Sequence, residues 1–165
     1  MTNTTPDINA KLKKMLLGLD CWYVAAGGKH VGSTFSLAFG ARIPRKFPLT
    51  NNSHSDEFRN YEGEARLLVW CTWRLDGMDA PVTSSDDTEQ NIVVGLARLV
   101  QSKIVDVLIE HPAWDLRLLF SPFLQLRVFC DHVPGSPSFD GNWEIHGVND
   151  SYYFGPGTAM GLESR

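Results

Sequence analysis

The stretch that most constrains the fold is residues 115–131, because it contains two runs in which apolar and polar side chains alternate. One face of the two runs collects large apolar residues: Leu116, Leu118, Phe120, Leu124, Leu126 and Val128. Pro122 lies in the short connection between the runs. Side chains alternate with a period of two along a strand, so this pattern predicts a β-hairpin with one buried and one mainly polar face.

The rest of the chain predicts two helices and further strands around this hairpin. Apolar residues at helical spacing predict one helix from Asp7 to about Gly18, and a second that follows a cap at Asp86 and carries its stripe over residues 92–100. Strands are predicted at residues 21–26, 34–39, 64–75 and 104–110, and a last short strand around Trp143 and Ile145. The sequence therefore predicts an α+β fold, mainly an antiparallel sheet with two helices packed on it. We expect one domain over residues 1–165, with loose termini at 1–6 and 150–165.

The order of elements is similar in the two parts of the chain. A helix followed by three strands occurs twice, and Leu37 and Phe39 of the first part recur as Leu118 and Phe120 of the second. One interpretation is a duplication into two helix-plus-three-strand halves. The other is that any α+β protein shows such echoes, and the sequence leaves both open.

Further predictions concern the segments 40–63, 64–75 and 78–87. Residues 40–63 are expected to be irregular, since Pro44 and Pro48 do not suit a central strand, and a connection longer than ~12–15 residues is often a binding loop. A helical turn is expected after Ser55. Residues 64–75 are expected to form one long central strand with aromatic residues on both faces, and residues 78–87 a polar loop.

Charge and cysteine usage narrow the class of protein. A net charge of −4 disfavours nucleic acid as a general partner, because phosphate binding requires clustered Lys and Arg. No apolar run reaches the ~18 residues of a membrane span. The three cysteines lie in apolar runs, which predicts reduced, buried thiols. The expectation is a cytoplasmic protein without a cofactor and with no membrane partner.

Motifs for catalysis and metal binding fit poorly. The segment around Lys29 differs from a phosphate-binding loop, because Tyr23 stands where that loop has glycine and His30 follows the lysine. Cys130 and His132 form a single pair, whereas structural zinc sites use two. Glu62 and Glu64 lie two residues apart at a strand start and could face one cleft as an acid–base pair, although acids at strand ends are usually just solvated. The alternative function is therefore a small-molecule-binding domain or enzyme that uses Lys29, His30, Glu62 and Glu64.

Acidic residues and tryptophans support a different hypothesis, a protein-binding surface. The candidate partner-binding residues are six acids on or beside loops and one aromatic anchor: Asp56, Glu57, Glu62, Glu64, Asp86, Asp87 and Trp73. Such a patch would attract a basic partner and steer its encounter, and exposed tryptophans are common anchors of interfaces. A flat acidic face with exposed tryptophan favours this hypothesis, and an enclosed polar pocket favours the alternative.

Several short strings resemble a known group of proteins. They are Gly28-Lys-His-Val-Gly-Ser-Thr-Phe, Glu62-Gly-Glu, Cys71-Thr-Trp-Arg-Leu, Asp115-Leu-Arg-Leu-Leu-Phe and Val128-Phe-Cys-Asp. Over most of residues 22–146 the chain resembles small bacterial immunity proteins of contact-dependent growth inhibition and related toxin systems. The resemblance implies a cytoplasmic protein that binds and neutralises one basic toxin domain, such as a nuclease. It carries no residue role over to this chain and leaves the oligomeric state open.

Overall fold

The computed structural model describes residues 5–27, 32–135 and 141–165. Within these ranges three helices and eleven strands follow one another in a mixed order. They are α1 (Thr5–Leu16), β1 (Cys21–Ala26), β2 (Phe35–Pro44), α2 (Asp56–Asn60), β3 (Tyr61–Val69), β4 (Thr72–Asp76), β5 (Pro81–Ser84), α3 (Glu89–Ala97), β6 (Lys103–Glu110), β7 (Asp115–Ser121), β8 (Leu124–Phe129), β9 (Trp143–His146), β10 (Asp150–Phe154) and β11 (Met160–Ser164). The predicted α+β class with antiparallel pairing is confirmed.

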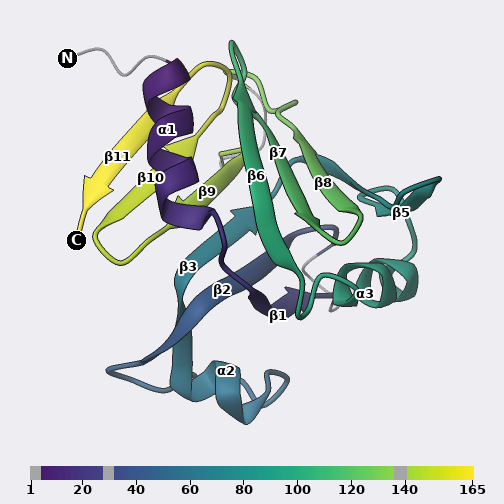
Figure 1. Ribbon diagram of the computed structural model, residues 1–165, viewed down its shortest axis with the longest axis vertical. Helices are drawn as coiled ribbons and strands as arrows, with labels where there is room; N and C mark the ends of the chain where they lie inside the picture. Colours follow the sequence, from purple (N-terminus) through teal and green to yellow (C-terminus); the bar gives the residue numbers. More distant parts are fainter. Residues whose placement is uncertain (1–4, 28–31, 136–140) are drawn as a thin grey trace.

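The strands form two antiparallel sheets that enclose one core (Figure 1). The six-stranded sheet has the order β1-β2-β3-β9-β10-β11, and the five-stranded sheet has the order β5-β4-β8-β7-β6. Their inner faces meet through contacts such as Phe39 with Phe120, whose ring centroids are 6.3 Å apart. The hairpin predicted at residues 115–131 is β7 and β8, and its leucines are buried in this core.

The topology repeats within the chain. A helix and three consecutive antiparallel strands occur as α1-β1-β2-β3 and again as α3-β6-β7-β8. After each set the chain crosses to the other sheet, so that β4 pairs with β8 and β9 pairs with β3. Each helix in turn contacts the first strand of the other half, α1 against β6 and α3 against β1. The structure therefore supports the duplication, with the two halves exchanging their fourth strands.

The hydrogen bonds where the halves meet obey the same symmetry. The Cys21 N–H donates to the Ser102 carbonyl at 2.8 Å, and the Ile104 N–H donates to the Leu19 carbonyl at 3.0 Å. Both first strands also have an irregular register directly after these residues, at 21–23 in β1 and at 104–106 in β6. Matching bonds and matching irregularities are typical of a duplicated unit.

The two buried tryptophans of the crossing strands occupy equivalent places. Trp73 in β4 is opposite Val128, and Trp143 in β9 is opposite Val69. Each indole N–H donates to a backbone carbonyl, that of Ser33 at 2.8 Å for Trp73 and that of Trp114 at 2.9 Å for Trp143. The hydrogen bonds let two large polar-tipped side chains fill the core without an orphaned donor.

The predicted single strand at residues 64–75 is wrong. It is two strands, β3 and β4, which belong to different sheets and are separated by Trp70 and Cys71. Buried residues still recur at every second position from Leu67 through Cys71 to Leu75. Because both sheets line one core, the alternation continues across the crossing, and a period-two pattern does not reveal where the chain changes sheets.

Three segments expected to be irregular contain regular structure. Residues 40–63 include the end of β2, the start of β3 and α2, which starts after Ser55 as predicted. The expected polar loop at 78–87 holds β5, and the expected loose tail holds β10 and β11. Pro44 is tolerated because it is the last residue of its strand. Tyr152 and Phe154 fix the tail by burying their side chains in the core.

Both predicted helices are present with shifted ends. The first runs over Thr5–Leu16, and Gly18 follows it with a φ of 82°. The second begins later than predicted, because Thr88 caps it by accepting a hydrogen bond from the Asn91 N–H. Asp86 is therefore not the cap residue.

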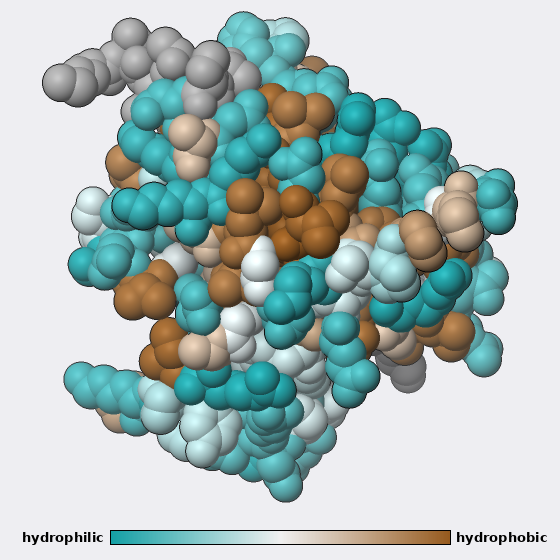
Figure 2. Space-filling view, viewed as in Figure 1, coloured by the Kyte–Doolittle hydropathy of each residue, from teal (hydrophilic) through white to brown (hydrophobic). Residues whose placement is uncertain are grey.

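The surface in Figure 2 is mostly hydrophilic, with hydrophobic residues gathered over the middle of β6. No helix within the described ranges is long and apolar enough to cross a membrane.

Candidate functional site

A large hollow among the described residues lies on the outer face of the six-stranded sheet. It is a groove of about 690 Å³ whose floor comes from β1, β2 and β3, and whose sides come from the 51–54 loop and α3. Gly27 allows α3 to approach, since a Cβ atom there would lie 2.8 Å from Val93 Cγ2. The volume is within the ~300–1,000 Å³ typical of small-molecule sites.

Arg66 is the one arginine or lysine among the described residues that line the groove. It lies in the middle of β3, opposite Ala38 of β2, and its side chain is on the outer face because Ala65 and Leu67 are fully buried in the core. Its Nε atom is buried and has no hydrogen-bond partner among the described residues. Burial, the main cause, lowers the pKa of the guanidinium, and nearby Arg45 lowers it further.

The two carboxylates that raise the pKa of Arg66, Glu144 and Glu62, each contact another side chain. Glu62 forms an ion pair with Arg45 at 3.7 Å, and a Glu144 carboxylate oxygen lies 3.1 Å from His146 Nε2. Both act on Arg66 without appearing among its ion pairs in the described part of the chain. A partly desolvated cation is thus left at the floor of a groove, which is unfavourable unless an anion completes it.

Neutral polar groups, apolar walls and the carboxylate residue Glu89 complete the described lining. The Tyr23 hydroxyl and His54 Nδ1 are 3.0 Å apart, and the Tyr23 ring stacks on Phe58 of α2 with centroids 4.1 Å apart. Burial is the main cause that lowers the pKa of His54, followed by the charges of Arg66 and Arg45. His54 is therefore held mainly neutral near pH 7, as a polar group without charge.

A Ser–His–Glu row lies beside the groove but lacks access. His146 Nδ1 is 2.9 Å from the Ser151 hydroxyl, and its Nε2 is 3.1 Å from Glu144. These residue types can form a nucleophile with its base and orienting acid. Ser151, however, is only 1% exposed, so its hydroxyl does not reach a ligand in this conformation. The row serves to order the sheet's outer face.

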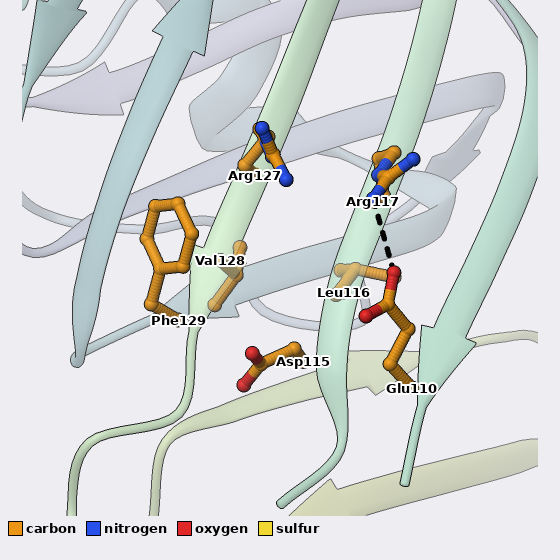
Figure 3. A pocket seen from close by; sticks show the side chains of 7 residues that line it. All are labelled: Glu110, Asp115, Leu116, Arg117, Arg127, Val128 and Phe129. Atoms are coloured by element: carbon orange, nitrogen blue, oxygen red, sulfur yellow. Dashed lines mark hydrogen bonds and ion pairs between the residues drawn. The ribbon is translucent and has the colours of Figure 1, made fainter.

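The outer face of the five-stranded sheet is different in character. Three arginines from neighbouring strands stand in one register row, with Arg74 opposite Arg127 and Arg127 opposite Arg117. Figure 3 shows the ion pair between Arg117 and Glu110, and it shows Arg127 on the neighbouring strand β8. The hollow at this place measures only about 30 Å³. The row is open to solvent, and its outer members have carboxylate partners.

The residues predicted to bind a partner do not form one surface. Trp73 is fully buried, so its predicted role as an exposed anchor is wrong: it faces inward between the sheets. On the lobe built by α2 and the adjoining strand ends, Glu57 pairs with Arg42 at 2.6 Å and Asp56 with Arg59 at 3.2 Å. These arginines offset the predicted negative patch.

The other candidate residues have local structural roles or lie outside the description. The Glu64 carboxylate accepts a hydrogen bond from the Ala41 N–H at 2.6 Å. Asp87 accepts bonds from the Thr88 N–H and the Asn91 side chain, which hold the start of α3 and lower the pKa of Asp87. Asp86 is exposed. Lys29 and His30 lie outside the described residues.

Sequence reasoning missed the groove and its arginine. The available signal was Arg66 itself, a single charge in the middle of a strand whose inward positions are apolar. The loop that forms one wall, residues 51–54, lies within the segment expected to be a binding loop, although that segment is largely regular.

Comparison with protein-family models, with curated proteins and with solved structures finds no match to this chain.

Proposed function

We propose that this protein is a binding domain for a small anionic molecule, which it holds in the groove over β1, β2 and β3. The observation that carries the proposal is the partly buried Arg66 at the floor of that groove, whose Nε donor has no hydrogen-bond partner among the described residues. A carboxylate or phosphate placed there would satisfy the orphaned donor and offset the desolvated charge. Hydrogen bonds to charged groups contribute ~1.5–3 kcal/mol each.

The lining also suggests the rest of the ligand. Leu68 and Val93 present apolar surface beside Arg66, and the buried Ser36 adds a small polar group. The ligand class is therefore an oxyanion attached to a largely apolar body. The function of the domain in this proposal is recognition, since the Ser151–His146 pair beside the groove is closed to a ligand.

Binding of matched probes tests the proposal. Octanoate and octyl phosphate serve as anionic probes and octanol as the uncharged control, each measured by calorimetry and by the shift in Tm. We expect both anions to bind the natural protein and Arg127→Gln, which alters the opposite outer face. Arg66→Gln should lose at least about tenfold in affinity, equal to ~1.4 kcal/mol. Equal binding of octanol, unchanged binding by Arg66→Gln, or no binding of any probe would overturn the proposal.

We propose toxin neutralisation as a second candidate function, supported by the exposed acids that remain without a structural role. Asp86 is exposed before α3, and the Asp56 side chain is 92% exposed despite its contact with Arg59. A basic toxin domain would meet these two first, and rim charges act mainly on the association rate.

The toxin test needs variants that spare the fold. Asp86→Lys and Asp56→Lys should slow association with a basic toxin domain encoded beside this chain and weaken its salt dependence, while Asp87 is avoided because it holds α3. Association is measured by stopped flow and protection by co-expression with the toxin. No binding to that toxin would remove this function, whereas unchanged association by both variants would remove only the chosen surface.

A further inference from the structure

Cys71 and Cys130 occupy equivalent places in the two halves. Cys71 follows Val69 of β3 by two residues, and Cys130 follows Val128 of β8 by two, at the points where the chain leaves each sheet. In the ladder between β4 and β8, Thr72 is opposite Phe129 and Trp73 is opposite Val128. Continued by one step, that register places Cys71 opposite Cys130.

The backbone bonds define the kind of pair. The Cys71 N–H donates to the Asn142 carbonyl at 3.2 Å, and the Cys130 N–H donates to Asp115 Oδ1 at 2.8 Å. Neither N–H is therefore directed at the facing cysteine, which is the arrangement of a non-hydrogen-bonded pair. Cα atoms in such pairs lie ~4.5 Å apart, at the short end of the ~4.4–6.8 Å that a disulfide spans.

The side chains agree with this register. The thiols of Cys71 and Cys130 lie within hydrogen-bonding reach of each other, and that contact, with burial, raises the pKa of Cys130. Both cysteines are free thiols; Cys71 is 2% exposed, whereas Cys130 is only partly buried. The Cys130 thiol also donates to the Trp114 carbonyl at 3.2 Å. Cys21 is instead directed at the Tyr23 carbonyl, at 3.7 Å.

We infer that Cys71 and Cys130 form a reversible oxidation site, at which a small-molecule disulfide such as oxidised glutathione converts the two thiols into a disulfide between the halves. The Cys130 thiolate, as the more accessible, attacks one sulfur of the small disulfide, and the other leaves as a thiol after taking up a proton. The Cys71 sulfur then attacks Cys130 and releases the second small thiol. The protein loses two protons and two electrons, and the small disulfide is reduced to two thiols.

The bond would join strands of both sheets through their common crossing point. Residues 71–130 would become a closed loop, and closing a long loop restricts the unfolded chain more than the folded one. Oxidation should therefore raise Tm and return it to the starting value on reduction. The reaction should be slow at pH 7 and faster at pH 9, because the contact with Cys71 and burial raise the pKa of the attacking Cys130 thiol.

Peptide mapping of the natural protein tests the inference without any substitution. Reduced protein is incubated with oxidised glutathione at pH 7 and pH 9, and the remaining thiols are blocked before proteolysis. We expect a loss of two hydrogens, about 2 Da, in one cross-linked peptide pair that contains Cys71 and Cys130, with Cys21 blocked. A bond that includes Cys21, glutathione adducts alone, or no reaction at pH 9 would overturn the inference.

Two variants provide the matched control. Cys21→Ser should still form the disulfide and show the rise in Tm. Cys130→Ser should not form the disulfide, and its Tm should not rise. A Tm rise of the same size in Cys130→Ser would separate the stabilisation from the bond and contradict the proposed link. Should Cys130→Ser not fold, the mapping of the natural protein decides by itself.

Discussion

The outer faces of the two sheets occupy equivalent places in the duplicated fold, yet their side chains have little in common. On the six-stranded sheet a register row runs through Ser36, Leu68 and Glu144. The equivalent row on the five-stranded sheet holds Arg117, Arg127 and Arg74. One face is walled by a helix and a loop and forms the groove, and the other is open (Figure 3).

The inner faces differ far less. Leu37 and Phe39 of β2 are opposite β1 and β3 in the same way that Leu118 and Phe120 of β7 are opposite β6 and β8. The core thus needs the same kind of side chain in both halves, because it must fill the same space, while an outer face is free to differ. The shared core between the sheets accounts for stability, and the outer faces are where the two halves differ.

We expect the largest loss of stability from substitutions that leave a cavity in the core of either half. Leu37→Ala and Leu118→Ala each remove a fully buried side chain, so each should lower the free energy of unfolding by ~2–5 kcal/mol. Urea denaturation followed by circular dichroism measures the change. A loss below ~0.5 kcal/mol for either variant, typical of surface substitutions, would show that its half does not share the common core.

A smaller effect is expected from the two equivalent tryptophans. Trp73→Phe and Trp143→Phe each remove an indole donor from a backbone carbonyl, and each should lower the free energy of unfolding by ~1–3 kcal/mol. Equilibrium denaturation checks both values, with Trp22→Phe as a control whose indole N–H has no partner in the described structure. A control as costly as the two variants would mean that lost ring volume, and not the hydrogen bond, sets the cost.

Arginine substitutions sharpen the contrast between the outer faces. Without ligand, Arg66→Met should raise the free energy of unfolding by about 1 kcal/mol, because it removes a partly buried charge that lacks a partner. Arg127→Met, on the open face, should change it by less than ~0.5 kcal/mol in either direction. Thermal denaturation in ligand-free buffer compares the two. Destabilisation by Arg66→Met would mean that its guanidinium is paired in the folded protein.

The sequence predicts the inner faces well and the outer faces poorly. Alternation of Leu116 with Arg117 identifies a buried face, because burial is set by local spacing. The alternation does not show that the chain changes sheets at Cys71, because both sheets line one core. It also missed β10, because Gly155 and Gly157 imply a loop and the strand's buried residues, such as Tyr152, have their partners elsewhere in the chain.

The candidate site follows the same division. Arg66 is visible as an isolated charge in a strand, but its lack of a partner depends on Glu62 and Glu144 binding other side chains. The Glu62–Arg45 pair joins residues far apart in the sequence. Glu144 and His146 are only two residues apart, but their position beside Arg66 depends on the pairing of β3 with β9. The predicted acidic residues likewise have partners that the sequence analysis did not anticipate, since Arg42 pairs with Glu57 and Arg59 with Asp56.

The smallest expected effect concerns His54 at the rim of the groove. Burial and the charge of Arg66 lower its folded-state pKa below the ordinary value of 6.5. Below about pH 6.5 the unfolded chain therefore binds this proton more readily than the folded one, and stability falls as pH falls; above that pH the contribution is constant. His54→Gln should flatten the dependence of unfolding free energy on pH between about 5 and 6.5.

A bound anion should act on the same titration in the opposite direction. Placed beside Arg66, it would offset the positive charge that His54 experiences and allow its protonation in the folded state. The loss of stability between pH 6.5 and 5 should then shrink in saturating octanoate, and His54→Gln should respond less to the probe. Urea titrations over this range measure both slopes. An unchanged slope with the probe bound would place the anion away from His54, outside the groove, and leave Arg66 without its proposed role.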